Sequence, residues 1–403
     1  MAQWELEREL NLLEFDTGLI YMPFNLLSHG QQTKILLATL FLKPNAFLLI
    51  DEPTNHLDTI ARKAVAKYLQ SKSGFILVSH DRTVLDECVD HIISINRADI
   101  DVQQGNFSTW EANKELQDNF ELSQNERLKR DINRLKQSAK EKSAWSTKTE
   151  KGKKGKQSSG LKADKGYVGH KAAKIMQLSK NIETRQNRAI SDKSKLLKNL
   201  ETADDLKLSP LVYPKQTLVE AMDLSISYDG NTIFDGLNFS IQNGDQVALI
   251  GKNGCGKSSV IKLLFGESIT HGGTLNIGSN LKISYVSQTT SHLKGDLRDY
   301  ADGLQIDESL FKSILRKLSF ERSQFDKNIE DYSEGQKKKV LLAGSLCEQA
   351  HLYIWDEPLN FIDVLSHGQI ENLVLKYKPT ILFVEHDTSF TERIATKKVE
   401  FLY

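Results

Sequence analysis

The chain has 403 residues with 53 basic and 53 acidic side chains, so its formal net charge is zero, and 39% of its residues are hydrophobic. This length leaves room for two or three domains with ordinary cores. The three cysteines lie far apart with no C-x-x-C pair, which argues against a disulfide framework or a zinc site, and no apolar run approaches the roughly 18 residues of a membrane span. Because no secretory apolar segment follows Met1, we expect a cytoplasmic protein without a membrane span.

Residues 1–110 predict alternating helices and strands. The stretch from Met1 to Phe24 is helical in period, and a second helix is expected from Thr33 to Leu42. Short apolar strands are expected at Phe47–Ile50, Phe75–Val78, His91–Ile95 and Asp101–Gln104. The first of these strands ends in Asp51-Glu52, and the second is followed by Ser79-His80. An acidic pair and a histidine at strand ends are candidates for a chemical role.

Residues 111–210 form a basic middle segment. From Arg127 to Lys198 there are 22 Lys and Arg against 6 Asp and Glu, so the rest of the chain is acidic. Apolar stripes at Leu116–Leu135 and Ala172–Leu200 predict an antiparallel helical hairpin, with a flexible tip at Ser143–Gly166 that is rich in Lys, Ser and Gly. A basic segment between acidic flanks favours a polyanion partner, although excess charge also keeps a plain linker in solution.

Residues 211–403 contain a phosphate-binding loop. Gly251 to Ser258 reads G-x-x-x-x-G-K-S, between a predicted strand at Gln246–Ile250 and a predicted helix from Ser259. The glycines allow backbone N–H groups to curl round a phosphate, and the helix N-terminus adds a partial positive charge. Lys257 can reach the β- and γ-phosphates, and the Ser258 hydroxyl can bind Mg²⁺. Cys255 occupies a variable position, where a tolerated small residue is a better interpretation than a redox switch.

Four motifs recur in one order, which indicates an internal repeat. The spacing is 305 residues at Ser28/Ser333, Asp51/Asp356 and Asp58/Asp363, and 306 residues at His80/His386. Chance does not hold one register across four motifs, so the chain contains two related units. The second unit contains the phosphate loop. In the first unit, no stretch before Leu27 resembles such a loop.

Each motif of the second unit has a physical role in phosphoryl transfer, which depends mainly on positioning and charge neutralisation. Asp356 can hold the water shell of Mg²⁺, and Glu357 can polarise the attacking water. His386 can contact the γ-phosphate, and Gln288 can sense that phosphate and the metal. Tyr228 is placed to stack on adenine or is simply an edge-strand aromatic.

The order phosphate loop, S-x-G-Q, strand with Asp-Glu, N-x-x-D and His resembles that of an ATP-binding cassette. The two Asp-Glu-Pro-x-Asn motifs, Leu27-Ser-His-Gly-Gln-Gln-Thr-Lys34 and the basic hairpin make the chain similar to the soluble tandem-cassette class F (ABC-F). It is particularly similar to the Lsa/Vga-like branch, which protects ribosomes and is associated with lincosamide, streptogramin A and pleuromutilin resistance. The resemblance implies an α/β fold: P-loop NTPase cassettes in tandem, the first incomplete, joined by an α-helical hairpin linker.

The same resemblance implies that ATP and Mg²⁺ bind between two cassettes of one monomer, with Ser258, Gln288 and Asp356 serving the metal. Glu357, His386 and Gln288 would be catalytic. The implied ATP-binding residues are Tyr228, Gly251, Asn253, Gly254, Gly256, Lys257, Ser258, Ser259 and Asp356 from the second unit with Ser28, Gly30, Gln31 and Asp58 from the first. A degenerate second site would combine Asp51, Glu52 and His80 with Ser333, Gly335, Gln336 and Asp363. Without a phosphate loop, this second site is expected to bind nucleotide hardly at all.

The chain departs from the family pattern in three ways. His29 and Glu334 stand where the signatures usually have a glycine, and we interpret His29 as a tolerated change. The front half of the first cassette is missing, so we expect an N-terminally truncated copy whose parallel sheet leaves apolar surface open. Whether residues 1–110 fold unaided is left open by the sequence.

The family implies a ribosome-associated ATPase whose basic linker, residues 127–198, contacts ribosomal RNA through phosphates. Three alternatives stay open. A transporter energy subunit would need a membrane partner and no long basic insert. A chromosome-maintenance ATPase would place its coil inside one cassette, often with a C-x-x-C at the apex. An inactive fragment would bind neither ATP nor ribosomes.

Overall fold

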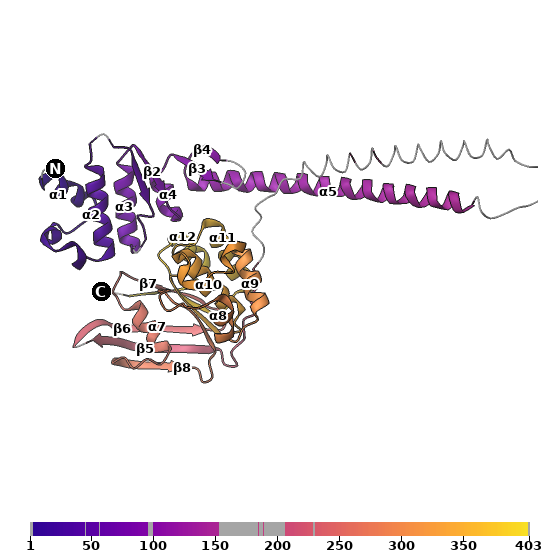
Figure 1. The fold of residues 1–403 in the computed structure, drawn as a ribbon. Coiled ribbons are helices and arrows are strands. Elements are labelled where there is room, and N and C mark those ends of the chain that lie inside the picture. The colour runs from indigo at the N-terminus through magenta and orange to yellow at the C-terminus, as the bar shows by residue number, and fades with distance from the viewer. Residues whose placement is uncertain are drawn as a thin grey trace, which may run out of the picture. The chain divides into compact units, whose positions relative to one another are not determined.

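The computed structural model describes residues 3–44, 46–55, 57–95, 100–152, 184, 188, 206–228 and 230–401. The chain divides into two compact units, one made of Met1–Ser108 with Ala203–Tyr403 and the other of Thr109–Thr202. The first of these compact units contains both copies of the internal repeat. We call the N-terminal copy the first region (residues 3–108) and the C-terminal copy the second region (residues 206–401). Figure 1 colours them indigo to purple and pink to yellow.

The first region is a small α/β arrangement. Its elements in order are α1 (Gln3–Leu12), the short turns η1 (Thr17–Tyr21) and η2 (Phe24–Leu26), α2 (His29–Phe41), β1 (Leu48–Asp51), α3 (Thr59–Gln70), β2 (Phe75–Val78), α4 (Arg82–Cys88), β3 (His91–Ile95) and β4 (Ile100–Gln104). Strands β1 and β2 pair in parallel, and β3 and β4 form an antiparallel hairpin. All four strands lie within one residue of their predicted bounds. Helix α2 begins four residues earlier than predicted because Ser28 caps it.

The second region is a larger α/β fold. Its strands are β5 (Thr217–Tyr228), β6 (Asn231–Gln242), β7 (Gln246–Ile250), β8 (His271–Ile277), β9 (Ile283–Val286), β10 (Leu352–Asp356), β11 (Ile381–Val384) and β12 (Lys397–Glu400). Its helices are α7 (Lys257–Leu264), α8 (Leu297–Gly303), α9 (Glu308–Lys317), η3 (Arg322–Gln324), η4 (Ile329–Asp331), α10 (Glu334–Cys347), α11 (Val364–Tyr377) and α12 (Thr388–Ile394).

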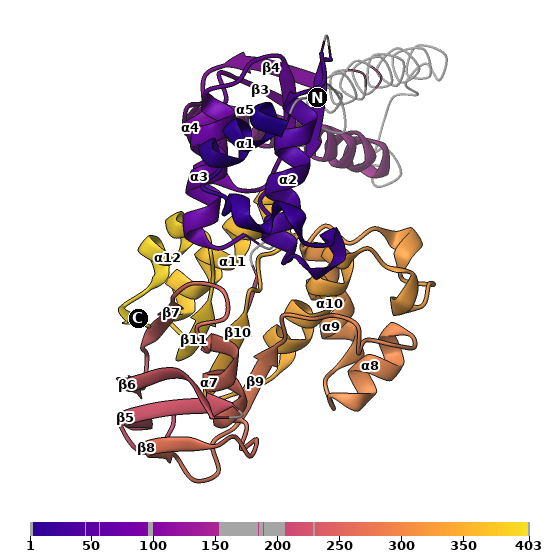
Figure 2. The ribbon, with the colours of Figure 1, turned by 90° about the vertical axis from the view of Figure 1, so that its left-hand side faces the viewer.

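Two sheets organise the second region. Five parallel strands run in the order β12-β7-β11-β10-β9, and three antiparallel strands run in the order β6-β5-β8. In Figure 2 the antiparallel strands lie together at the bottom of the view, and α7 lies next to them. One apolar core fills the space between α7, the antiparallel sheet and one face of the parallel sheet. A second core lies between the other face and helices α8 to α12, and it includes Leu206 and Leu208.

The two-stranded sheet of the first region buries only one face. Leu48 and Ile50 are buried, but Leu49 on the opposite face is 72% exposed. Its repeat equivalent Ile354 is completely buried against the antiparallel sheet and α7. The same contrast holds for Val78, which is 52% exposed, and its equivalent Val384, which is 1% exposed. The expectation that this sheet leaves apolar surface open is therefore confirmed.

The basic middle segment begins as one long helix, α5 (Phe107–Gly152). This helix starts four residues before the predicted hairpin and continues ten residues into the segment predicted as a flexible tip, which corrects the tip boundary at Ser143. A run with few helix breakers before Gly152 explains the extension. The rest of the tip and the second predicted helix lie outside the described residues, apart from residues 184 and 188, which are helical. In the part of the chain that the structure describes, every helix is too short or too polar to cross a bilayer.

Candidate functional site

The phosphate loop connects β7 to α7, as the sequence predicts. Gly254 and Gly256 adopt left-handed backbone angles, with φ of 82° and 99°. A Cβ at Gly256 would lie 2.7 Å from the ring of Phe234, so only glycine fits there. Lys257 Nζ donates hydrogen bonds to the carbonyl oxygens of Gly251 at 2.7 Å and Lys252 at 2.8 Å. The loop is thus closed round a buried ammonium at the N-terminus of α7, an arrangement that favours anions.

Three neighbouring strand ends bring the catalytic candidates together, because the carboxyl ends of parallel strands share one edge of the sheet. Glu357 directly follows β10, and its left-handed backbone angle, φ 49°, turns its side chain out of the strand line. Gln288, beyond β9, donates from Nε2 to Glu357 Oε1 at 2.9 Å. His386, beyond β11, places Nε2 3.5 Å from the same oxygen. Asn360 donates to the other oxygen, Oε2.

The acidic pair sits in a strongly perturbed electrostatic environment. Burial, followed by the neighbouring Glu357, raises the pKa of Asp356 to about 6 despite opposing contributions from Lys338 and Lys257. Burial also acts to raise the pKa of Glu357, but His386, Gln288 and Lys338 outweigh it, and the pKa lies below its usual value. Glu357 is consequently a carboxylate at neutral pH, the form that can polarise water.

Sequence reasoning missed Lys338, the buried cation beneath this pair. Its Nζ donates to the carbonyl oxygens of Ser287 at 2.8 Å and Glu357 at 3.0 Å, and its side chain is 1% exposed. Burial lowers its pKa, against the attraction of the surrounding carboxylates. The equivalent residue in the first copy of the repeat is Thr33, so comparison of the two copies did not point to Lys338.

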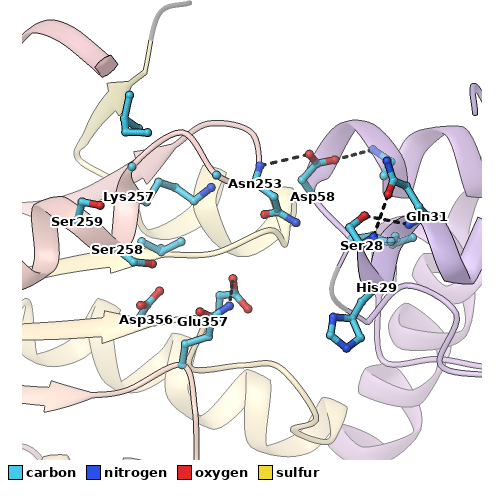
Figure 3. Close-up of a pocket in the computed structure, with 18 of the residues that line it drawn as sticks. Ser28, His29, Gln31, Asp58, Asn253, Lys257, Ser258, Ser259, Asp356 and Glu357 are labelled. Atoms are coloured by element: carbon cyan, nitrogen blue, oxygen red, sulfur yellow. Dashed lines mark hydrogen bonds between the residues drawn. The ribbon is translucent and has the colours of Figure 1, made fainter. Parts of the chain in front are cut away.

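A cavity of about 710 Å³ joins the two regions at this edge. Figure 3 shows Lys257, Ser258 and Ser259 on one side and Ser28, His29 and Gln31 on the other. The predicted residues that line it are Ser28, Gly30, Gln31, Asp58, Tyr228, Asn253, Gly254, Gly256, Lys257, Ser258, Ser259, Gln288, Asp356 and Glu357. The repeat therefore folds so that the first S-x-G-Q motif faces the phosphate loop of the second region.

Local structure positions the residues from the first region. Ser28 caps α2: Gln31 N–H donates to Ser28 Oγ at 3.3 Å, and Ser28 N–H donates to Gln31 Oε1 at 2.9 Å. Asp58 caps α3 and accepts a hydrogen bond on Oδ2 from the phosphate-loop N–H of Asn253 at 3.4 Å (Figure 3). This last contact ties the two regions together at the mouth of the loop.

Some residues lie elsewhere than predicted. Gly251 and His386 line an adjoining cavity of about 370 Å³ rather than the main one, although each contacts a main-cavity residue. Tyr228 lines the main cavity, is 42% exposed and donates from its hydroxyl to Ser259 Oγ at 3.0 Å. The cavity residues that the sequence did not predict as site residues are Glu14, Phe15, Asp16, His29, Lys34, Leu57, Ala61, Ile233 and Val384. Four of these nine lie in loops, and the other five lie in helices and strands that only the tertiary fold brings together.

The residues predicted for a degenerate site come together only in part. His80 Nε2 lies 3.6 Å from Glu52 Oε1, and the charges of Asp363, Lys339 and Asp51 act on His80. Burial, followed by Asp51 and Asp81, raises the pKa of Glu52 to about 7. Ser333 and Gln336 form a capping box for α10 that matches the box at Ser28. Neither these two residues nor Gly335 lines the main cavity or the adjoining one.

The main cavity fits a magnesium-bound nucleoside triphosphate. Its volume lies within the range of small-molecule sites, and the phosphate-binding elements converge on it. Next to Lys257 the site presents hydroxyl, amide and carboxylate oxygens from Ser258, Gln288 and Asp356, which are the ligands that Mg²⁺ prefers. Burial, followed by Glu357, raises the pKa of Asp356, and a bound cation would stabilise the ionised form of this carboxyl.

A buried carboxylate lies at the seam between the regions. Glu385 accepts hydrogen bonds from the N–H groups of Leu359 at 2.8 Å and His386 at 3.0 Å. Burial raises the pKa of Glu385 from 4.5 to about 7. Between these two pH values the carboxyl is protonated in the native state and ionised in the unfolded state. By linkage, its contribution to stability falls as the pH rises through this window.

Glu385→Gln removes this titration. We expect the free energy of unfolding of the variant, relative to the parent, to increase by about 2–3 kcal/mol between pH 4.5 and pH 8, because the parent alone must ionise a buried group. Urea unfolding at both pH values measures this difference. A difference that stays constant with pH would contradict the assignment.

The two regions also meet away from the cavity. Arg82 Nη1 of the first region lies 3.2 Å from Glu371 Oε1 of the second, whose other oxygen is paired within its own region with Arg393 Nη1 at 2.9 Å. The hydroxyls of Thr83 and Thr388 are 3.2 Å apart. Helices α4 and α12, which begin at equivalent points of the repeat, therefore pack against each other across the seam.

Comparisons with known proteins agree with this geometry. A family model described as "ABC transporter" matches residues 234–360, and one described as an AAA domain matches residues 7–86. ATP-binding protein Uup of Haemophilus influenzae is 30% identical over 408 residues, which cover 98% of this chain and 58% of that protein. Ribosome protection protein VmlR of Bacillus subtilis is 27% identical over 392 residues, which cover 93% of this chain and 68% of that protein.

A solved structure of similar fold is an archaeal ribosome recycling factor, aABCE1, in complex with the stalk protein aP1. It aligns with a TM-score of 0.62 at 20% identity, covering 100% of this chain and 66% of that one. Together the matches confirm the predicted fold class: mixed α/β phosphate-loop ATPase domains of the ATP-binding cassette type, two of them, with a helical region between. The chain spans a little over half the length of most curated relatives it matches.

Proposed function

We propose that this chain is a class F ATP-binding cassette protein that binds and hydrolyses ATP and acts on the ribosome. The observation that carries the proposal is the cavity that places the S-x-G-Q cap of one region opposite the phosphate loop of the other. Relatives along nearly the whole chain include a ribosome protection protein, and a ribosome recycling factor shares the fold. These similarities support kinship with class F and a cytoplasmic, ribosome-associated role.

The residues of the cavity suggest how hydrolysis proceeds. The glycine-rich loop and Lys257 bind the phosphates, and the first region closes the cavity from the other side. Mg²⁺ held by Ser258, Gln288 and Asp356 would neutralise charge on the phosphates. Glu357, ionised and oriented by Gln288 and Asn360, polarises the attacking water. His386 stands next to Glu357, where it can hydrogen-bond the terminal phosphate.

The finer part of the proposal concerns the basic linker. The segment from Arg127 to Lys198 has 22 basic residues against 6 acidic ones, which suits ribosomal RNA, whose phosphates attract Lys and Arg without regard to sequence. We place the linker on this RNA, and we assign the protein to ribosome protection against lincosamides, streptogramin A or pleuromutilins.

Deletion of residues 143–166 tests this proposal. The deletion removes the last ten residues of α5 and the part of the predicted tip that follows them. We expect the deleted protein to bind ATP like the parent but to lose protection of translation against these drugs, because the part of the linker proposed to meet RNA is gone. Drug inhibition of a cell-free translation reaction, with and without each protein, provides the measurement. Protection that survives the deletion would remove the tip from the mechanism.

Sedimentation addresses the partner directly. In a sucrose gradient with a non-hydrolysable ATP analogue, the parent should migrate with ribosomes, and raised salt should release it. Protein that stays at the top of the gradient at low salt would refute action on the ribosome. It would favour one of the other cassette functions.

A further inference from the structure

The internal repeat contains a pair of equivalent lysines that behave differently. Lys34 and Lys339 each stand six residues after the serine that caps their helix, Ser28 and Ser333. In the second region, Lys339 Nζ lies 2.6 Å from Asp363 Oδ2. Asp363 is the repeat equivalent of Asp58, so the same pairing would be available to Lys34.

Lys34 does not make that pair. Asp58 accepts hydrogen bonds instead from the N–H of Ala61 at 2.9 Å and from the phosphate-loop N–H of Asn253 at 3.4 Å. Lys34 Nζ donates only to the backbone carbonyl of Glu14, at 3.3 Å. Within the described residues, no carboxylate lies within the 4.0 Å of an ion pair from Lys34 Nζ, which leaves its positive charge without a close counter-charge.

The surroundings of Lys34 indicate why the absence of a carboxylate within ion-pair distance matters. The side chain is half-buried on the wall of the main cavity, which it shares with Lys257 and Ser258. Burial lowers the pKa of Lys34, although Glu14 and Asp58 act in the opposite direction. A partly desolvated ammonium is costly unless an anion compensates it, and the phosphate loop that lines the same cavity is a binding site for anions.

We propose that Lys34 is a second phosphate-binding lysine, which reaches across from the first region to the terminal phosphate of the ATP that Lys257 holds. The inference rests on the proposed ATP site and names a residue that the family motifs do not assign. The terminal phosphate is the expected contact because it carries the largest share of the charge and because ADP lacks it. In this arrangement Asp58 contacts the phosphate loop through Asn253, and the ammonium of Lys34 is available to bind the nucleotide.

The test compares two nucleotides on the full chain. Lys34→Ala is expected to weaken binding of the analogue adenylyl imidodiphosphate with Mg²⁺ about tenfold, since it removes one charge-assisted hydrogen bond, and to change ADP affinity less than about twofold. Lys34→Arg keeps the charge and should restore most of the affinity. Isothermal titration calorimetry gives both constants for each variant.

Lys339→Ala is the matched control. It makes the same truncation at the equivalent position, in the region where the lysine is already paired with Asp363, and should leave the preference for the triphosphate unaltered. Equal losses for the two nucleotides in Lys34→Ala, or no loss for either, would overturn the inference. An arginine variant as weak as the alanine variant would also count against a charge contact.

Lys257→Ala separates this inference from the function on which it rests. If Lys257→Ala abolishes binding while Lys34→Ala leaves it unchanged, the ATP site stands and only the role of Lys34 fails. If the parent chain binds neither nucleotide, or if Lys257→Ala binds as well as the parent, the proposed ATP site itself is wrong.

Discussion

Replacing Lys257 with alanine is expected to weaken ATP binding at least about 100-fold, because the change removes two things at once. It removes the cation nearest the phosphates. It also removes the donor that holds the carbonyls of Gly251 and Lys252 at 2.7 and 2.8 Å, so the loop loses the contacts that fix its shape. Fluorescence titration with a labelled ATP measures the affinity.

Lys262→Ala is a suitable control for this prediction. Lys262 lies on the same helix α7, but its side chain points to solvent and does not line the cavity. Its removal should leave ATP affinity within about twofold, since exposed lysines contribute little. Unchanged affinity in Lys257→Ala would mean that nucleotide binds somewhere other than the assigned loop.

Replacing Glu357 with glutamine is expected to slow ATP hydrolysis about 100- to 1,000-fold while ATP stays bound, the range typical for loss of a general base. Glutamine has nearly the same shape, so the contacts with Gln288 and Asn360 can be kept in part. It lacks the negative charge that the lowered pKa of Glu357 preserves in the parent. Phosphate release in single-turnover reactions measures the rate.

The same variant should accumulate on ribosomes in the presence of ATP, because a site that cannot hydrolyse stays closed. Glu308→Gln, which changes a half-buried carboxylate that is paired with Lys312 and lies outside the cavity, serves as control and should hydrolyse ATP like the parent. A Glu357→Gln variant that hydrolyses at the parent rate would assign water activation to another group. One that traps ATP but remains free of ribosomes would contradict the proposed partner alone.

The sequence by itself determined the elements whose signals are local. An apolar run, a glycine-rich loop and a lysine predicted β7, the phosphate loop and α7, since these residues specify their own backbone. The 305-residue register likewise predicted that Ser28, Asp51 and Asp58 play roles equivalent to Ser333, Asp356 and Asp363, and both serines do cap helices in the same way. The end of α5 was predicted wrongly because lysine-rich segments are as compatible with a helix as with a loop.

Only the tertiary structure decided which side chains share the cavity and in which charge state. Lys338 lies beneath the acidic pair, and Lys34 lies without an ion-pair partner. Nothing in the residues next to either lysine in the sequence predicts these surroundings. Asp58 and Asp363 are equivalent in the repeat, yet one contacts the phosphate loop and the other a lysine. Such differences arise because burial and partner choice depend on packing between segments far apart in the chain, and no local pattern of residues encodes that packing.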